Sequence, residues 1–147
     1  YHNQLETLLL RQRDAFGVAI LFDCHSMPHD ALISAPMVRG SRPNVILGDR
    51  FGAACARWVI DAATAVFSDA GFTVARNAPF AGGYITQHYG RPSHGIHALQ
   101  IEVDRSLYMD EAALTRHANF DDLVGRLDTV VSGLVGLGRT AAPLAAE

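Results

Sequence analysis

The sequence predicts an α/β fold in three layers, with a mainly parallel or mixed sheet that carries helices on both faces. Short apolar, β-prone runs alternate along the chain with longer segments whose apolar residues recur at helical spacing. The chain has 147 residues, of which 49% are hydrophobic and 18% charged, so it is large enough to bury a core. We therefore expect a single α/β domain over residues 1–147.

The chain opens on a predicted helix over about residues 3–14, where Leu5, Leu8 and Leu9 repeat at helical spacing. No initiator Met precedes this helix. We therefore expect the domain to lack an N-terminal portion.

Apolar runs and helical periodicities predict the remaining elements. Gly71 is expected to end the second helix, because glycine readily adopts the left-handed conformation of a helix C-cap. Trp58 and Phe67 are expected in the core on the buried side of that helix. The expected elements are strand 17–23, a long loop over 24–43, strand 44–48, helix 52–70, strand 72–76, a glycine-rich passage over 81–90, strand 96–103, helix 121–137, and a frayed end from Thr140.

Composition and charge exclude several classes of partner. The net charge is −3, and the twelve basic residues, all arginine, form no run or stripe, so we expect no nucleic-acid binding. No segment is apolar for long enough to span a membrane, and we expect no signal peptide. Cys24 and Cys55 are interpreted as buried thiols of a reducing compartment, which favours a cytoplasmic protein. The oligomeric state stays open.

Two predicted strands lead into titratable residues. The run from Gly17 to Asp23 is typical of a buried strand, and His25 follows at its carboxyl end, where α/β sheets place their chemistry. The strand that starts at Ile96 reaches a carboxylate at Glu102. Both residues are expected to face one crevice.

These residue types suit a metal-dependent hydrolase. Zinc is commonly held by His and carboxylate ligands, and a further carboxylate that is not a ligand acts as the general base. His25 fits the first role and Glu102 the second. Asp23 either orients the imidazole or caps backbone groups. The sequence lacks a compact ligand pair such as His-Glu-x-x-His, and His94 with His97 is the nearest substitute.

Four ordered blocks resemble the N-formylglutamate amidohydrolase (N-formylglutamate deformylase) family. The resemblance runs from the first residue to about residue 135. The blocks are Asp23–Pro28, Gly48–Gly52, Gly82–Gly90, and His97–Glu102 followed by Tyr108–Glu111.

The resemblance implies an α/β hydrolase domain with a phosphorylase/hydrolase-like, carboxypeptidase-like fold, similar to that of aspartoacylase. It makes His25 a Zn²⁺ ligand and Glu102 the general base. It also implies that two further ligands, a His and an acidic residue, come from a portion that precedes Tyr1 and is missing here. The implied reaction is hydrolysis of N-formyl-L-glutamate to formate and L-glutamate, a late step of histidine breakdown.

A substrate with two carboxylates needs cationic partners, and planar Arg side chains suit them. Arg50 is favoured because it lies in one of the blocks, near a strand end; Arg76, Arg91 and Arg105 are weaker candidates. Asn77, Thr86 and His88 are expected to form hydrogen bonds with the substrate.

Three other interpretations remain. The chain is alternatively an aspartoacylase-like deacylase of another N-acyl amino acid, or a non-catalytic α/β fragment without the metal-binding half. The third makes Cys24 a thiol nucleophile beside His25. It is disfavoured because adjacent residues of a strand point to opposite faces.

Overall fold

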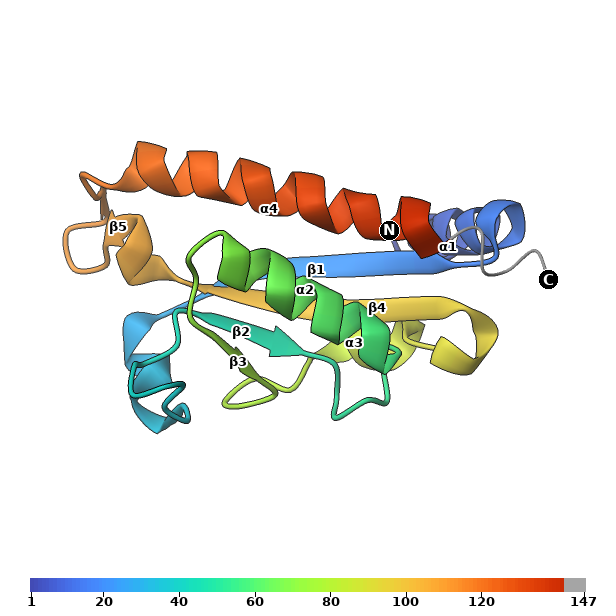
Figure 1. Cartoon of the computed structure of the whole chain (residues 1–147), viewed down its shortest axis with the longest axis horizontal. Coiled ribbons are helices and arrows are strands. Elements are labelled where there is room, and N and C mark those ends of the chain that lie inside the picture. The colour runs from blue at the N-terminus through green and yellow to red at the C-terminus, as the bar shows by residue number, and fades with distance from the viewer. Residues whose placement is uncertain (142–147) are drawn as a thin grey trace.

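The computed structural model describes residues 1–141, so most of the segment that we expected to fray lies outside the described residues. Four strands form one sheet in the order β1-β4-β2-β3 (Figure 1). The strands are β1 (Ala19–Met27), β2 (Val45–Gly48), β3 (Val74–Arg76) and β4 (Ile96–Asp104). The helices are α1 (His2–Phe16), α2 (Arg57–Asp69), α3 (Tyr84–Tyr89) and α4 (Phe120–Ala141).

The sheet is mixed, because the strand direction reverses between its two central strands, β4 and β2. β1 runs parallel to β4, and β2 runs parallel to β3. β2 and β4 are antiparallel neighbours. The predicted mixed α/β sheet is therefore confirmed, but the carboxyl ends of β1 and β4 lie at the opposite edge from those of β2 and β3. Three short 3₁₀ segments (His29–Ser34, Pro92–His94, Arg105–Leu107) and a hairpin of β5 (Met109–Asp110) and β6 (Thr115–Arg116) complete the described fold.

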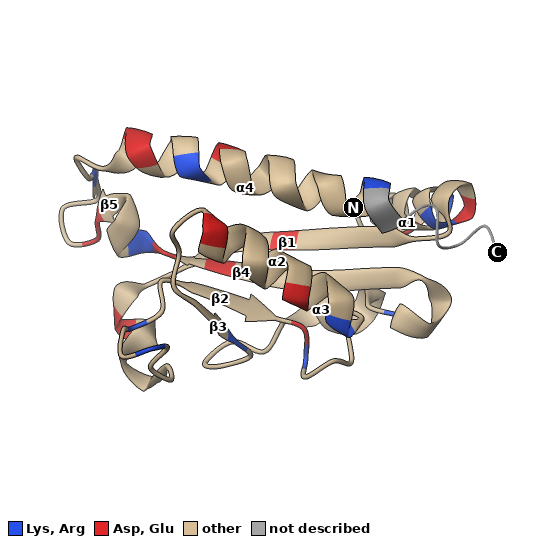
Figure 2. Cartoon of the chain, viewed as in Figure 1, with Lys and Arg blue, Asp and Glu red and all other residues tan. Residues whose placement is uncertain are grey.

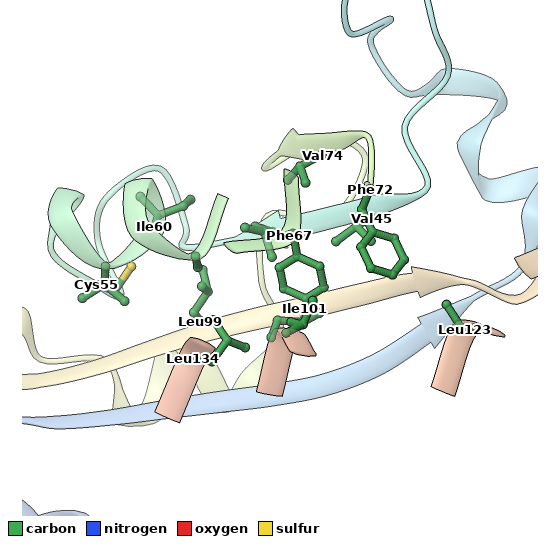
Figure 3. Close-up of a cluster of buried hydrophobic side chains, with 14 residues drawn as sticks. Val45, Cys55, Ile60, Phe67, Phe72, Val74, Leu99, Ile101, Leu123 and Leu134 are labelled. Atoms are coloured by element: carbon green, nitrogen blue, oxygen red, sulfur yellow. The ribbon is translucent and has the colours of Figure 1, made fainter. Parts of the chain in front are cut away.

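One face of the sheet packs against α2 and α4 and holds the main core. Leu99 and Ile101 of β4 meet Phe67 of α2 and Leu134 of α4 there (Figure 3). Phe67, predicted as a core residue, is 1% exposed. This face is apolar because alternate residues of each strand point toward it.

The opposite face is covered by α1, α3 and the 3₁₀ segment that follows β1. Leu9 of α1, Tyr89 of α3 and Ile96 of β4 form one small cluster on it. Met27, Leu32 and Ile46 form another. The three-layer arrangement is thus present. Between these clusters, the strand residues that point to this face include polar ones.

Several elements differ from the sequence prediction. β1 continues to Met27, four residues beyond the predicted end, so His25 lies inside the strand. Helix α2 begins at Arg57 because residues 49–53 form a turn in which Arg50 and Phe51 have positive φ. Trp58 is 41% exposed, so its prediction as a core residue is wrong. Within residues 1–141, no helix combines the length and apolar character needed to cross a bilayer.

Candidate functional site

The polar residues of β1 and β4 lie side by side on the face covered by α1 and α3. In the parallel register, Asp23 is opposite Gln100 and His25 is opposite Glu102. Because alternate strand residues share a face, all four side chains project from the same side of the sheet. Figure 2 shows the acidic positions of these two neighbouring strands. The register places His25 and Glu102 opposite each other on one face of the sheet, which a common crevice would require.

His25 is paired with the carboxylate two residues before it on β1. Its Nε2 lies 3.0 Å from Asp23 Oδ2, and the His25 side chain is 47% exposed. The spacing of two residues produces this contact, because both side chains leave the strand on the same face. Asp23 is thus placed where it can orient the imidazole, one of the two roles that we expected for it.

Glu102 is buried, with 8% of its surface exposed. Its Oε1 accepts a hydrogen bond of 2.9 Å from Gln100 Nε2. Burial raises the pKa of the Glu102 carboxyl, while His25 and the Gln100 hydrogen bond oppose that shift. A carboxyl with a raised pKa is a stronger base than an ordinary one and is suited to proton transfer.

The glycine-rich passage begins with a turn that lies against Gln100 and Arg50. Gly83 N–H donates a hydrogen bond of 2.6 Å to Gln100 Oε1. Gly82 has φ +124°, and a Cβ there would lie 2.5 Å from Thr86 Oγ1 and 3.1 Å from Arg50 Cγ. Only glycine allows these side chains to approach the backbone so closely.

Arg50 is held beside this turn by its backbone. Its N–H donates to Ala81 O at 2.7 Å, and its φ is +56°. Among residues 1–141, no ion pair involves its guanidinium. Arg50 is therefore a cation near the glycine turn without an acidic partner in the described structure.

The other three predicted substrate-binding arginines have protein partners. Arg76 contacts Asp61 at 2.6 Å. Arg91 donates to backbone carbonyls of Gln87 and Gly90. Arg105 donates to the side chain and carbonyl of Ser26. Of the four arginines, Arg50 is therefore the best-placed candidate to bind a substrate carboxylate.

Asn77 stabilises the turn that carries Arg50. Its Nδ2 donates to Asp49 Oδ1 at 2.7 Å, and its Oδ1 accepts from the N–H groups of Asp49 and Phe51. Asp49 is itself 4% exposed. The amide of Asn77 is thus engaged within the protein, and its predicted hydrogen bond to substrate would require it to leave these partners.

Thr86 and His88 lie on different sides of α3. Thr86 is 1% exposed, and its hydroxyl donates to Gly83 O at 2.8 Å, so it lies at the glycine turn. His88 is exposed and stacks on Tyr84, with ring centroids 5.0 Å apart. In the described part of the chain, His88 forms no hydrogen bond, ion pair or ring contact with His25 or Glu102. The structure therefore brings Thr86, but not His88, to the turn beside Gln100.

The alternative histidine pair does not converge. His97 is buried, accepts a hydrogen bond from Ala56 N–H at 3.3 Å and packs edge-on against Trp58. Burial lowers the pKa of His97, which favours its neutral form. His94 lies in the 3₁₀ segment before β4. Across the described residues, no group of three or more His, Cys, Asp or Glu side chains is arranged to hold a metal ion.

Sequence reasoning did not select Gln100, which contacts both Glu102 and the glycine turn. The signal was present, because Gln100 and Glu102 are two residues apart in a mostly apolar strand and must share a face. It also missed the pairing of His29 with the buried Asp104, at 2.8 Å. That pair depends on the fold of the 3₁₀ segment after β1, which the sequence pattern did not indicate.

A model of the N-formylglutamate amidohydrolase family matches residues 1–109 of this chain. The N-formylglutamate deformylase of Pseudomonas putida is 38% identical over 116 residues, which cover 76% of this chain and 41% of that protein. The N-formylglutamate deformylase of Pseudomonas aeruginosa is 36% identical over 118 residues, covering 77% of this chain and 42% of that protein. The chain thus spans less than half the length of these curated relatives.

Solved structures show the same similarity. The crystal structure of N-formylglutamate amidohydrolase from Ralstonia eutropha JMP134 superposes with a TM-score of 0.80 and 30% identity, covering 96% of this chain and 50% of that one. A gene product from Agrobacterium tumefaciens superposes with a TM-score of 0.51 and 18% identity, over 93% of this chain and 50% of that one, which shows a likeness of fold alone.

Proposed function

Because this chain belongs to the N-formylglutamate amidohydrolase family, we propose that it takes part in hydrolysing N-formyl-L-glutamate to formate and L-glutamate. The observation that carries the proposal is the register of β1 and β4, which sets His25 beside Glu102. The proposal includes a cytoplasmic location and a role in histidine breakdown. The partner is a small N-formyl amino acid.

The proposed cofactor is Zn²⁺, with His25 as one ligand. When bound, zinc supplies a water whose pKa is lowered toward ~7 and polarises the carbonyl that is attacked. The side chains of the described residues provide no three-ligand cluster and so do not form a complete zinc site by themselves. Asp23, 3.0 Å from His25 Nε2, would hold the imidazole in a fixed orientation.

Glu102 would move the proton during hydrolysis. Its burial and raised pKa suit a carboxylate that accepts a proton from the attacking water. The same group would then give that proton to the departing amine, which leaves as L-glutamate. Gln100 occupies one carboxylate oxygen, so the other oxygen of Glu102 would carry the proton.

Arg50 would bind a carboxylate of the substrate. Its guanidinium has no acidic partner among residues 1–141, and a planar guanidinium can hold a carboxylate through two parallel hydrogen bonds. Thr86, at the adjacent turn, is a weaker candidate for a hydrogen bond to the substrate. Asn77 acts in this proposal by holding the turn, because its amide already binds Asp49.

An aspartoacylase-like deacylase would use the same His25 and Glu102 and differ in the acyl group that it removes. A non-catalytic fragment would keep the sheet without hydrolysis. Two assays with added Zn²⁺ separate these three interpretations. They measure formate release from N-formyl-L-glutamate and acetate release from N-acetyl-L-glutamate. Faster acetate release would favour the deacylase, and no release of either acid would favour the non-catalytic reading.

The decisive variant is Glu102→Gln. It is expected to keep the fold, measured by circular dichroism, and to lower the turnover of N-formyl-L-glutamate by about 10²- to 10⁴-fold, as for the loss of a general base. The matched control is Glu6→Gln, which changes an exposed carboxylate of α1 and is expected to leave turnover unchanged. Near-normal turnover of Glu102→Gln would remove this residue from the proposed role.

A further inference from the structure

Gln100 connects the glycine turn to the carboxylate of Glu102. Its side chain is almost completely buried, with 7% of the residue exposed. At one end its Oε1 accepts from Gly83 N–H at 2.6 Å, and at the other its Nε2 donates to Glu102 Oε1 at 2.9 Å. A buried amide with a partner at each end is held in a single position.

The backbone determines which way this amide points. A peptide N–H can only donate, so the end of Gln100 that faces Gly83 must be the carbonyl oxygen. The NH₂ group is therefore directed at Glu102, and a donor at this distance favours the ionised carboxylate over the protonated acid. Reversing the amide would place an N–H against the N–H of Gly83 and an oxygen against the carboxylate.

The second oxygen of Glu102 is left for other partners. Its Oε2 takes part in no hydrogen bond with residues 1–139, whose side chains the structure describes. No buried side-chain nitrogen or oxygen of the described chain lacks a partner, so Oε2 must reach solvent. The two oxygens thus differ, because one is fixed by Gln100 and the other faces the space where a water can approach.

We propose that Gln100 is a positioning residue for Glu102. It holds one carboxylate oxygen through a donor whose direction is set by Gly83, and presents the other oxygen to water. The same amide ties Glu102 to the turn beside Arg50, because Gly82 lies against the Arg50 side chain. This inference depends on the proposed role of Glu102 as the base.

Three changes at Gln100 separate positioning from a purely structural role. Gln100→Glu keeps an acceptor for Gly83 but directs a second carboxylate at Glu102. It is expected to lower kcat for N-formyl-L-glutamate by about tenfold to a hundredfold, the range for loss of a hydrogen bond to a charged group, with little change in KM. Gln100→Met removes both bonds and is expected to lower kcat and also raise KM, since the turn beside Arg50 is released.

The third change exchanges the two residues, as Gln100→Glu with Glu102→Gln. In this double variant Gly83 again donates to residue 100, and the amide at 102 donates to the carboxylate at 100. Protection of the Gly83 amide from hydrogen exchange, measured by NMR, is expected to match that of the unmodified protein, while turnover stays lost. Loss of this protection would contradict the bond from Gly83 to residue 100 on which the positioning role depends.

The control is Gln4→Glu, which adds the same charge at an exposed position of α1 and is expected to leave kcat and KM unchanged. Full kcat in Gln100→Glu, with the unmodified protein active, would overturn the role of Gln100 while leaving the proposed function intact. Absence of formate release from the unmodified protein with Zn²⁺ would instead overturn the proposed function, and this inference with it.

Discussion

Each candidate site residue is supported by a specific neighbour. Asp23 contacts His25, and Gln100 contacts Glu102. Behind Arg50, Asn77 binds the buried Asp49 and so fixes the turn from which the arginine projects. Such supporting contacts matter because a side chain that must meet a small molecule loses effectiveness when it can occupy several positions.

Arg50→Lys is expected to weaken substrate binding while preserving the fold. Lysine keeps the charge but has no planar pair of donors, so KM for N-formyl-L-glutamate should rise about tenfold or more. Arg39→Lys is the matched control, because Arg39 is also an arginine with positive φ but is exposed in the loop after β1. Equal KM values for the two variants, from formate-release assays, would exclude Arg50 as a carboxylate ligand.

At the residue scale, contacts could be predicted from the sequence where the alternation of side chains along a strand determines which residues share a face. Asp23 and His25, two apart on β1, had to share a face, and the contact between them follows from that alone. The surroundings of Asn77 and His88 were not predictable in this way. Their partners, Asp49 and Tyr84, depend on a left-handed turn and on a short helix that no periodicity indicated.

At the scale of elements, two turns lock together beside the sheet. The turn after β2 donates from Arg50 N–H to the carbonyl of Ala81, in the turn before α3. Gly48 has no room for a side chain, because a Cβ there would lie 2.7 Å from the Ala81 backbone. The position of Arg50 therefore depends on the backbone of the glycine turn.

Gly82→Ala is expected to destabilise the protein by about 1–3 kcal/mol and to lower activity. A Cβ at Gly82 would lie 2.5 Å from Thr86 Oγ1, and φ +124° is unfavourable for alanine. Gly125→Ala is the control, because that helical glycine has nothing within 4 Å of a built Cβ and alanine is the better helix former. Urea unfolding should show the two variants changing the free energy of unfolding in opposite directions. A neutral Gly82→Ala would contradict the close packing of this turn.

Most elements could be predicted from apolar patterns, but their ends could not. The strand prediction stopped at Asp23 because polar residues follow, whereas β1 continues through His25 to Met27 by pairing with β4. The pairing of distant segments outweighs local composition there. Helix α3 was missed because it has only six residues, too few to show a repeating apolar stripe.

At the scale of the whole molecule, a core on one face of the sheet supports the polar site on the other. Phe67 and Leu134 belong to helices α2 and α4, on the side away from Glu102. Substitutions in that core should therefore act on stability before they act on the site. The buried Cys55 belongs to this core and lies near Asp49, which joins it to the turn that carries Arg50.

Stability is expected to fall in alkaline solution because of Cys55. Burial, together with Asp49, raises the pKa of its thiol from 9.0 to about 12. A thiol with a pKa raised in the folded state favours folding fully below pH 9, and this contribution is lost as the pH rises toward 12. The free energy of unfolding, measured in urea between pH 8 and 11, should fall less steeply in Cys55→Ala. Parallel curves for the two proteins would exclude this contribution.

The antiparallel pairing of β2 with β4 fixes how far the Arg50 turn lies from Glu102 along the sheet. Ile46 of β2 pairs with Glu102, and Gly48 pairs with Gln100. Because the chain continues from Gly48 of β2 to Arg50, it runs away from Glu102 toward that arginine. Each residue of a strand advances about 3.3 Å, and the paired ladder keeps that offset constant. The spacing between the Arg50 turn and the strand position of Glu102 is therefore set by backbone pairing, which is stiffer than a loop would be.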